Sequence, residues 1–429
     1  MFSIPTFTIY ITICLSAIII LLYLYWTRNF DYWKNRGIPF EKPLPFFGNL
    51  KDVLTFKKNI GMSLKDIYDK MEGPYLGIFL VDKPALLLKD LEVIKHVLVT
   101  DFSNFSDRTM AQRKSDLGSS LLPMMRDAEW KAYRKLLTPG YSSSKIKKMY
   151  DIVVDTSLDM VRHIGKILET DDVVNARHEA ALYGAEVITS TAFGMKGDCF
   201  DDEHSGFKKA AERIFDFNDP SRSISTSCYM MFHTLVHIFR LKFVDGWSET
   251  FLREEFLKTV KYRKDNNITR YDFVDILINL KKNNKINEVD MDDEKMAAQA
   301  ITFFIAGFET TSATISFSLY ELAKNPFIQK KVRDEITPIL DAHEFIPYKT
   351  VNSGMVYTEM VMRGVKFATV SIKSAIANII YNFEVELIDH DTNEMEFHPR
   401  AFTTAPKTMT LPLRFRKIHR ENTKYPIKV

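Results

Sequence analysis

The stretch that decides the fold runs from Glu294 to Lys324 and reads EKMAAQAITFFIAGFETTSATISFSLYELAK. It contains no proline, and its apolar residues recur with the period of a helix. We expect one continuous helix, about 45 Å long at 1.5 Å per residue. A helix as apolar as this one is buried, so it predicts the centre of a helical core.

The middle of this stretch carries its most unusual residues, Ala306-Gly307-Phe308-Glu309-Thr310. Glycine inside a helix costs about 1 kcal/mol relative to alanine, so Gly307 indicates close approach by another group. The Thr310 hydroxyl is placed to bond the carbonyl of Ala306 and loosen the helix there. Glu309 is then a carboxylate in apolar surroundings and a candidate proton carrier. The competing interpretation is a core helix with a solvent-facing glutamate.

Outward from this helix, helical periodicity continues through most of the chain. Asn325 as N-cap and Pro326 as first residue predict a further helix, Pro326 to Ile336. Other segments with a 3.6-residue period are Met62–Met71, Leu91–Val99, Ser144–Glu169, His178–Thr191 and Glu249–Lys264. Strand-like runs are few: a hairpin of Tyr75–Phe79 with Ala85–Leu88, and C-terminal runs Phe383–Ile388 and Met409–Phe415. The expected fold class is mainly α with a small β subdomain.

The N-terminus has the pattern of a membrane anchor. No charged residue occurs from Ile4 to Trp26, which is about long enough to cross ~30 Å of hydrocarbon. Arg28, Lys34 and Arg36 follow this run and none precedes it, which places the body of the protein on the cytoplasmic side. The alternative is a cleaved signal peptide, but the apolar run is too long and lacks a basic start and a cleavage site. We therefore assign residues 1–27 to a single transmembrane helix.

A proline-rich stretch follows the anchor. Three prolines, Pro39, Pro43 and Pro45, lie within seven residues, which excludes a helix interior. Residues 28–50 are interpreted as a stiff linker, with an ordinary irregular loop as the alternative. Residues 51–429 are then one large domain.

A second local pattern is Trp130-Lys131-Ala132-Tyr133-Arg134. Trp130 and Arg134 are four residues apart, so they share one face of a helix. An indole N–H beside a guanidinium suits an anionic group such as a carboxylate. The alternative is a buried tryptophan with an unrelated exposed arginine.

Composition narrows the classes of function. The chain has 429 residues, 46% of them hydrophobic, and a formal net charge of +3. This composition excludes a disordered chain, and so small an excess of positive charge gives no argument for nucleic acid as a partner. The three cysteines, Cys14, Cys199 and Cys228, have no CxxC spacing, which argues against a disulfide framework or a structural zinc site.

Taken in order, these motifs resemble the microsomal cytochrome P-450 family of haem-thiolate monooxygenases. The motifs are the anchor, RGIPFEKPLPFFGNL, WKAYRKLLTP, EVITSTAFG, AGFETT and LAKNPFIQKKVRDEI. The tail GVKFATVSIKSAIANIIYNFEVEL resembles the helix and strand that follow the haem-binding loop. The resemblance covers nearly the whole chain and is nearest to the insect xenobiotic-metabolising branch.

The resemblance implies roles for the residues of these motifs. Trp130 and Arg134 would pair with a haem propionate. Ala306 and Gly307 would line the groove over the iron, and Glu309 and Thr310 would deliver protons to bound dioxygen. The implied cofactor is haem and the implied reaction inserts one oxygen atom of O2 into an apolar small molecule. The electrons would come from NADPH through a cytochrome reductase, at the endoplasmic reticulum membrane.

One departure from the family pattern concerns the axial ligand. The family uses a cysteine thiolate, which favours O–O cleavage. The corresponding position here is near Met362, and the Glu-x-x-Arg pair of the preceding helix is also missing. Both flanks resemble the family, so we expect an internal deletion of about 70 residues near 362–364, roughly half a typical domain. No protein ligand for the metal is predicted, and catalysis by this chain is in doubt. The alternative is a haem-free inactive paralogue, a splice variant or an incomplete gene model, binding at most an apolar ligand or the reductase.

Overall fold

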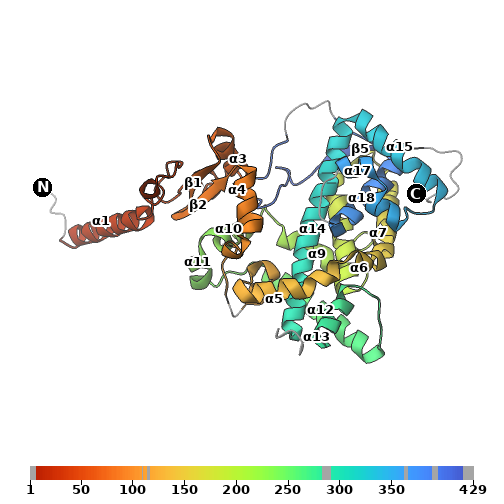
Figure 1. The fold of residues 1–429 in the computed structure, drawn as a ribbon, viewed down its shortest axis with the longest axis horizontal. Coiled ribbons are helices and arrows are strands. Elements are labelled where there is room, and N and C mark those ends of the chain that lie inside the picture. Colours follow the sequence, from red (N-terminus) through yellow and green to blue (C-terminus); the bar gives the residue numbers. More distant parts are fainter. Residues whose placement is uncertain are drawn as a thin grey trace. The chain divides into compact units, whose positions relative to one another are not determined.

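The computed structural model describes residues 6–108, 110–113, 116–282, 291–361, 366–388 and 395–418. The chain divides into two compact units (Figure 1). One comprises residues 1–109 and 397–404, and the other comprises residues 110–396 and 405–429. Met362, the predicted ligand position, lies outside the described residues.

The first unit begins with the apolar helix α1, Thr6–Thr27. Its segment Thr8–Thr27 has a mean hydropathy of 2.2 and no buried residue, so it is long and apolar enough to span a membrane. After α1 the described part of this unit contains short helices, single turns and a hairpin. These are η1 (Lys34–Arg36), α2 (Lys51–Leu54), α3 (Ile60–Lys70), β1 (Tyr75–Leu80), β2 (Lys83–Leu88) and α4 (Leu91–Lys95), followed by η2 (His96–Thr100) and η3 (Phe102–Asn104).

The hairpin was predicted from sequence and is present. β1 and β2 pair antiparallel, with Tyr75 opposite Leu88 and Leu80 opposite Lys83. The turn is tighter than expected, because Lys83 and Pro84 belong to β2. Val81 takes up the reversal with a φ of 64°. The indole of Trp33 donates to the Ile78 carbonyl at 3.0 Å, so the segment after α1 packs on this hairpin.

The described residues of the second unit are mainly helical and include one small sheet. This unit starts with two short turns, η4 (Leu117–Ser120) and η5 (Leu122–Met124). The helices that follow are α5 (Asp127–Leu137), α6 (Ser143–Lys148), α7 (Tyr150–Ile167), α8 (Ala176–Ile188), α9 (Gly206–Ile214), α10 (Pro220–Met231), α11 (His233–Ile238), α12 (Gly246–Asn266), α13 (Phe273–Lys282), α14 (Asp293–Lys324), α15 (Pro326–Ala342), α16 (Tyr348–Ser353), α17 (Val356–Val361) and α18 (Lys366–Asn382). The turn η6 (Thr138–Tyr141) follows α5, and the π-helical turn η7 (Thr189–Phe193) extends α8.

The predicted central helix is confirmed as α14, which is continuous from Asp293 to Lys324. It packs against α8, α12 and α18, and α18 also contacts α7 and α15. The second long apolar segment in the described chain is α14 itself, but half of that segment is buried in the protein. We therefore assign α14 to the core.

The sheet of this unit has the order β3-β5-β4, with both pairs antiparallel. Its strands are β3 (Val173–Asn175), β4 (Phe383–Glu386) and β5 (Pro412–Lys417). β5, the last described strand of the chain, therefore lies between β3 and β4 and pairs with both. Both predicted C-terminal strands exist: β4 begins at Phe383 as predicted and ends two residues early, and β5 is shifted by two to three residues toward the C-terminus.

Three expectations about helices need correction. The segment Ser144–Glu169 is two helices, α6 and α7, which meet at Met149. The end of Leu91–Val99 is a π-helical turn, η2. Asn325 does not cap α15 with its side chain; its amide instead donates to the Glu321 carbonyl at 2.8 Å. α15 itself begins at Pro326 as predicted and continues to Ala342.

Candidate functional site

The middle of α14 combines buried and exposed positions. Phe304 and Phe308 are buried, whereas Ala306 and Thr310 are exposed. The Thr310 hydroxyl donates to the Ala306 carbonyl at 2.6 Å, as the sequence predicted. One strip of an otherwise core-facing helix is therefore open at Ala306 and Thr310, four residues apart on one face.

Glu309 lies beside this strip, on a buried part of α14. Its side chain is 2% exposed and accepts a hydrogen bond from Arg177 of α8 at 2.9 Å. The side chain of Arg177 is itself only 8% exposed. The expected apolar surroundings are therefore wrong, because a guanidinium faces the carboxylate, and the alternative of a solvent-facing glutamate is wrong as well. Any proton transfer by Glu309 would have to begin from this ion pair.

Gly307 is explained by the helix that packs on it. A Cβ at this position would lie 2.3 Å from Cδ1 of Ile188 in α8. Across the same contact, a Cβ on Gly184 would lie 3.1 Å from the Phe308 carbonyl oxygen. The close approach predicted from Gly307 is that of a neighbouring helix, and it sets the spacing between α8 and α14.

Trp130 and Arg134 both lie on α5. Trp130 is half-buried and Arg134 is exposed, while Tyr133 between them is buried. Burial raises the pKa of nearby Tyr141 to about 12, and the charge of Arg134 acts against that rise. The Arg134 guanidinium makes no ion pair within the described chain, so its charge remains available to an anionic group.

The region around residue 362 contains contacts that the sequence did not reveal. Lys373 of α18 has no exposed side-chain surface, and its ammonium donates to Glu359 of α17 at 2.6 Å. It also donates to the Val351 carbonyl at 3.1 Å. Glu359 and Lys373 stand on either side of residues 362–365, so the ion pair connects the two flanks of the predicted deletion.

The short helix α17 is held at its N-terminal end by α15. The carboxylate of Glu335 accepts hydrogen bonds from the amides of Tyr357 and Thr358, both at 2.8 Å. It also accepts one from the Thr358 hydroxyl at 2.6 Å. A carboxylate at this end satisfies orphan N–H groups and complements the helix dipole. The sequence signal for this contact is absent, because Glu335 is 22 residues away from Tyr357.

The cysteines lie in three separate parts of the chain. Cys14 is exposed on α1, Cys199 is buried between η7 and α9, and Cys228 is buried in α10. Burial raises the pKa of the Cys199 and Cys228 thiols. The Cys199 amide donates to Glu186 at 2.9 Å, which fixes this loop against α8. In the described parts of the chain, no group of three or more His, Cys, Asp or Glu residues is arranged to hold a metal ion.

Comparison with known proteins agrees with the order of the motifs. The family model described as Cytochrome P450 matches residues 38–363. Cytochrome P450 6k1 of Blattella germanica is 33% identical over 369 residues, covering 82% of this chain and 70% of the relative. Cytochrome P450 6j1 of the same species is 35% identical over 366 residues, covering 84% and 72%. Probable cytochrome P450 6d5 of Drosophila melanogaster is 31% identical over 349 residues, covering 77% and 68%.

Proposed function

The chain belongs to the cytochrome P450 family, and on that premise we propose that it is a shortened form of a membrane-bound monooxygenase that does not itself carry out thiolate-haem chemistry. Members of this family carry haem, receive electrons from a reductase and act on small molecules. The insect relatives support assignment of the parent activity to the xenobiotic-metabolising branch, with an apolar small molecule as substrate.

The observation that carries this proposal is the placement of the cysteines. The last cysteine of the sequence is Cys228, so none lies between α14 and α18, where the family ligand was predicted. Cys199 and Cys228 are both buried and precede α14 in the chain, and burial raises the pKa of both thiols. The residues present therefore do not fit a thiolate-ligated haem, and we assign no reaction step to one.

Other parts of the family site are retained in this proposal. Trp130 and Arg134 would face a propionate, Ala306 and Gly307 would line the cofactor groove, and Glu309 and Thr310 would form the proton path in the parent enzyme. Arg134 is exposed and without an ion pair in the described chain, and the strip of Ala306 and Thr310 is open, which supports the roles of these three residues. Gly307 packs against Ile188 of α8, and Glu309 pairs with Arg177, so these two residues lack that support. Helix α1 supports an anchor in the endoplasmic reticulum with the body facing the cytoplasm.

A second candidate function is binding of an apolar ligand without haem. It is favoured by the exposed strip at Ala306 and Thr310 in the middle of a core helix. Calorimetry on the haem-free chain tests it directly: saturable binding of apolar small molecules supports this function. Absence of binding together with rapid proteolysis of the chain would exclude it.

The test of the first proposal is the sequence of the transcript across the codons for Met362–Gly364. If the junction is genuine, the codons for Met362, Arg363 and Gly364 are contiguous in the messenger RNA of the tissue. If about 70 in-frame codons with a Glu-x-x-Arg pair and a cysteine appear there, this chain is an incomplete version of an ordinary monooxygenase. Haem content of the purified chain provides an independent measurement.

A further inference from the structure

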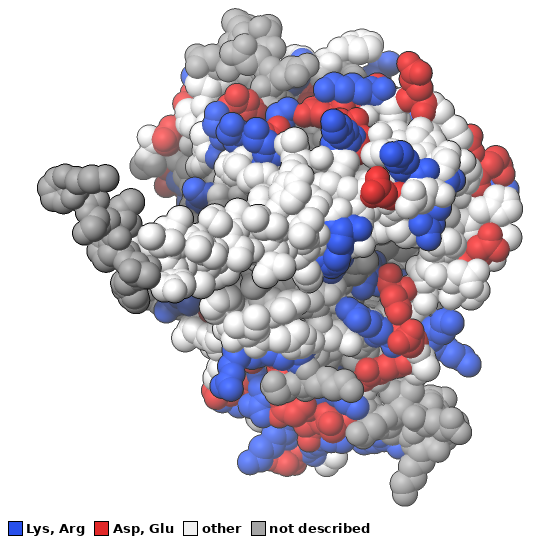
Figure 2. All heavy atoms as spheres, turned by 90° about the vertical axis from the view of Figure 1, so that its left-hand side faces the viewer, with Lys and Arg blue, Asp and Glu red and all other residues white. Residues whose placement is uncertain are grey.

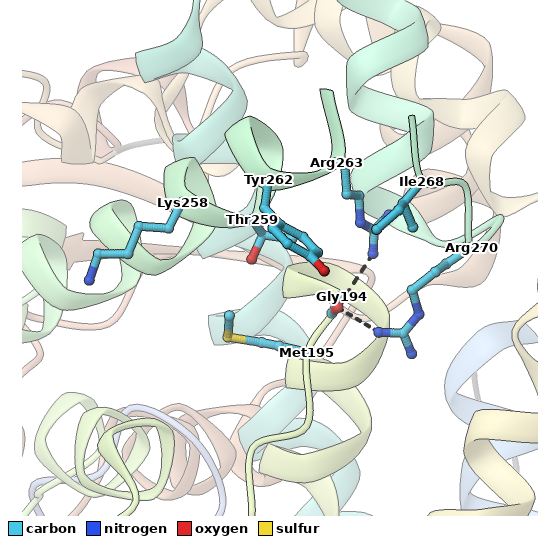
Figure 3. A pocket seen from close by; sticks show the side chains of 8 residues that line it. All are labelled: Gly194, Met195, Lys258, Thr259, Tyr262, Arg263, Ile268 and Arg270. Atoms are coloured by element: carbon cyan, nitrogen blue, oxygen red, sulfur yellow. Dashed lines mark hydrogen bonds between the residues drawn. The ribbon is translucent and has the colours of Figure 1, made fainter. Parts of the chain in front are cut away.

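A cavity of about 410 Å³ lies beside α12, away from the residues discussed above (Figure 3). We call it the α12 cavity. Its wall is formed by the end of η7, by one face of α12 and by the loop that follows α12. The residues that line it and carry the argument are Gly194, Met195, Lys258, Tyr262, Ile268 and Arg270.

The inner wall of the α12 cavity is fixed by a buried arginine. Arg263 is 3% exposed, and its guanidinium donates to Asp272 at 2.6 Å and to Asp275 at 2.7 Å. It also donates to the Gly194 carbonyl at 3.4 Å. Gly194 has a φ of +67°, and a Cβ there would lie 1.9 Å from Nη2 of Arg263, so only glycine fits. Arg263 therefore connects Gly194 on one side of the wall to Asp272 and Asp275 on the other.

The charged residues that line the α12 cavity are all basic. Its lining includes Lys258, Arg263 and Arg270 and no acidic residue. The charge of Arg263 is met by the two buried carboxylates behind it, and Lys258 pairs with Glu255 at 2.7 Å. In the described chain Arg270 makes no ion pair, and its guanidinium donates only to the neutral Gly194 carbonyl, at 2.5 Å. Arg270 therefore offers an unneutralised charge at the cavity.

Apart from Thr259, the rest of the lining is apolar or aromatic. Figure 3 shows the Tyr262 ring between Met195 on one side and Ile268 and the Arg270 guanidinium on the other. Small-molecule sites are clefts of about 300–1,000 Å³ with apolar walls and a few polar groups that fix orientation. Arginine recognises a carboxylate with a two-pronged hydrogen bond, and a tyrosine ring provides a face for an aromatic ligand.

We propose that the α12 cavity is a binding site for a small aromatic carboxylate. The carboxylate pairs with Arg270, and the ring lies between Tyr262, Met195 and Ile268. This site uses no residue of the candidate haem region, so it stands whether or not the proposed function is correct.

The test uses 4-benzoylbenzoate, a benzophenone carboxylate that crosslinks to nearby side chains under light. The full chain in detergent is irradiated with this probe, and the labelled peptides are identified by mass spectrometry. Parallel samples use Arg270→Gln, Tyr262→Ala and the neutral analogue 4-methylbenzophenone. The matched control is Arg240→Gln, which removes one exposed positive charge outside the cavity lining.

We expect saturable labelling in peptides that contain Met195 or Ile268. Arg270→Gln should reduce it about fivefold, the upper range for a solvent-accessible ion pair, and Arg240→Gln should leave it unchanged. Tyr262→Ala should also reduce labelling, and the neutral analogue should label these peptides less than the carboxylate. The proposal is overturned if these peptides are not labelled, or if labelling is the same in Arg270→Gln as in the unmodified chain. Arg270 is exposed, so its replacement does not disturb the core, and circular dichroism verifies that the variant is folded.

Discussion

Two buried ion pairs hold different parts of this molecule, and they are built differently. Arg177 and Glu309 join α8 to α14, and both side chains are shielded from water, at 8% and 2% exposure. Lys373 and Glu359 join α18 to α17, but only the lysine is buried, because the Glu359 side chain is 53% exposed. Both members of the first pair are shielded from solvent, whereas in the second pair the carboxylate is exposed to it.

This difference in exposure determines how much stability each region loses when one member of its ion pair is removed. Removing one member of a fully buried pair leaves an uncompensated charge in the core, whereas a half-exposed carboxylate is still solvated when its partner is lost. The α8–α14 pair lies within residues 38–363, which match the family model, and Lys373 lies beyond them. Glu359 and Lys373 are only 14 residues apart, so a short junction brings them together.

Exposed charged side chains are a third source of electrostatic stability, besides these two ion pairs. On the face drawn in Figure 2, basic and acidic side chains are intermingled and do not form a broad basic stripe. Exposed pairs of this kind contribute about 0–1 kcal/mol each. The stability differences that distinguish the two regions should therefore come from the buried pairs.

The largest effect should follow Arg177→Met. This change leaves the Glu309 carboxylate buried without its counter-ion and should lower the free energy of unfolding by about 3–5 kcal/mol. Guanidinium denaturation of the chain in detergent, followed by circular dichroism, measures it. The double variant Arg177→Met/Glu309→Leu removes both charges and should recover most of the loss. A loss in the double variant as large as in the single variant would contradict this account of the pair.

The second effect separates the two members of the other pair. Glu359→Ala should lower the free energy of unfolding by about 1.5–3 kcal/mol, because the buried Lys373 ammonium loses its charged acceptor. Lys373→Met keeps the apolar stem and leaves Glu359 in water, so it should lower stability by less than about 1.5 kcal/mol. If the two variants lost equal free energy of unfolding, solvent exposure of Glu359 would not distinguish the two members of the pair.

A smaller effect is expected at the end of α17. Glu335→Ala removes the acceptor for the amides of Tyr357 and Thr358 and should reduce stability by about 0.5–2 kcal/mol, as loss of a helix cap does. Hydrogen exchange of the α17 amides should accelerate in this variant. Glu344→Ala, at an exposed position beyond α15, is the control and should leave that exchange rate unchanged.

The smallest effect should be that of Thr310→Val. The hydroxyl bonds a carbonyl of its own helix on an exposed strip, so its loss should alter the free energy of unfolding by less than about 0.5 kcal/mol. Thr314→Val is the matched control, because the Thr314 hydroxyl makes the same bond to Thr310 at 2.7 Å. A loss above 1 kcal/mol at Thr310 alone would assign that hydroxyl a structural role.

Local patterns predicted the elements well and their partners poorly. The 3.6-residue apolar period predicted α14, and Pro326 predicted where α15 begins. The turn residues between two strand-like runs predicted the β1–β2 hairpin. Gly307 correctly indicated a close approach. These features are decided by residues within one or two turns of each other.

What failed depends on contacts between distant segments. Arg177 and Glu309 are 132 residues apart, so the residues next to Glu309 in the sequence do not indicate that a guanidinium pairs with it. The break between α6 and α7 at Met149 is likewise not marked by glycine or proline, so periodicity alone predicted one helix. Lys373 appears in sequence as one more charged helical residue, and only its packing between helices shows that it is buried.

The central claim is that this family member carries no thiolate ligand for haem, and the absorption spectrum of the reduced chain with carbon monoxide tests it most directly. The full chain is produced in membranes with a haem supply, solubilised, reduced and exposed to the gas. We predict that no thiolate-type Soret band appears. A stoichiometric band of that type would show that one of the chain's own cysteines ligates the iron, and would contradict the account.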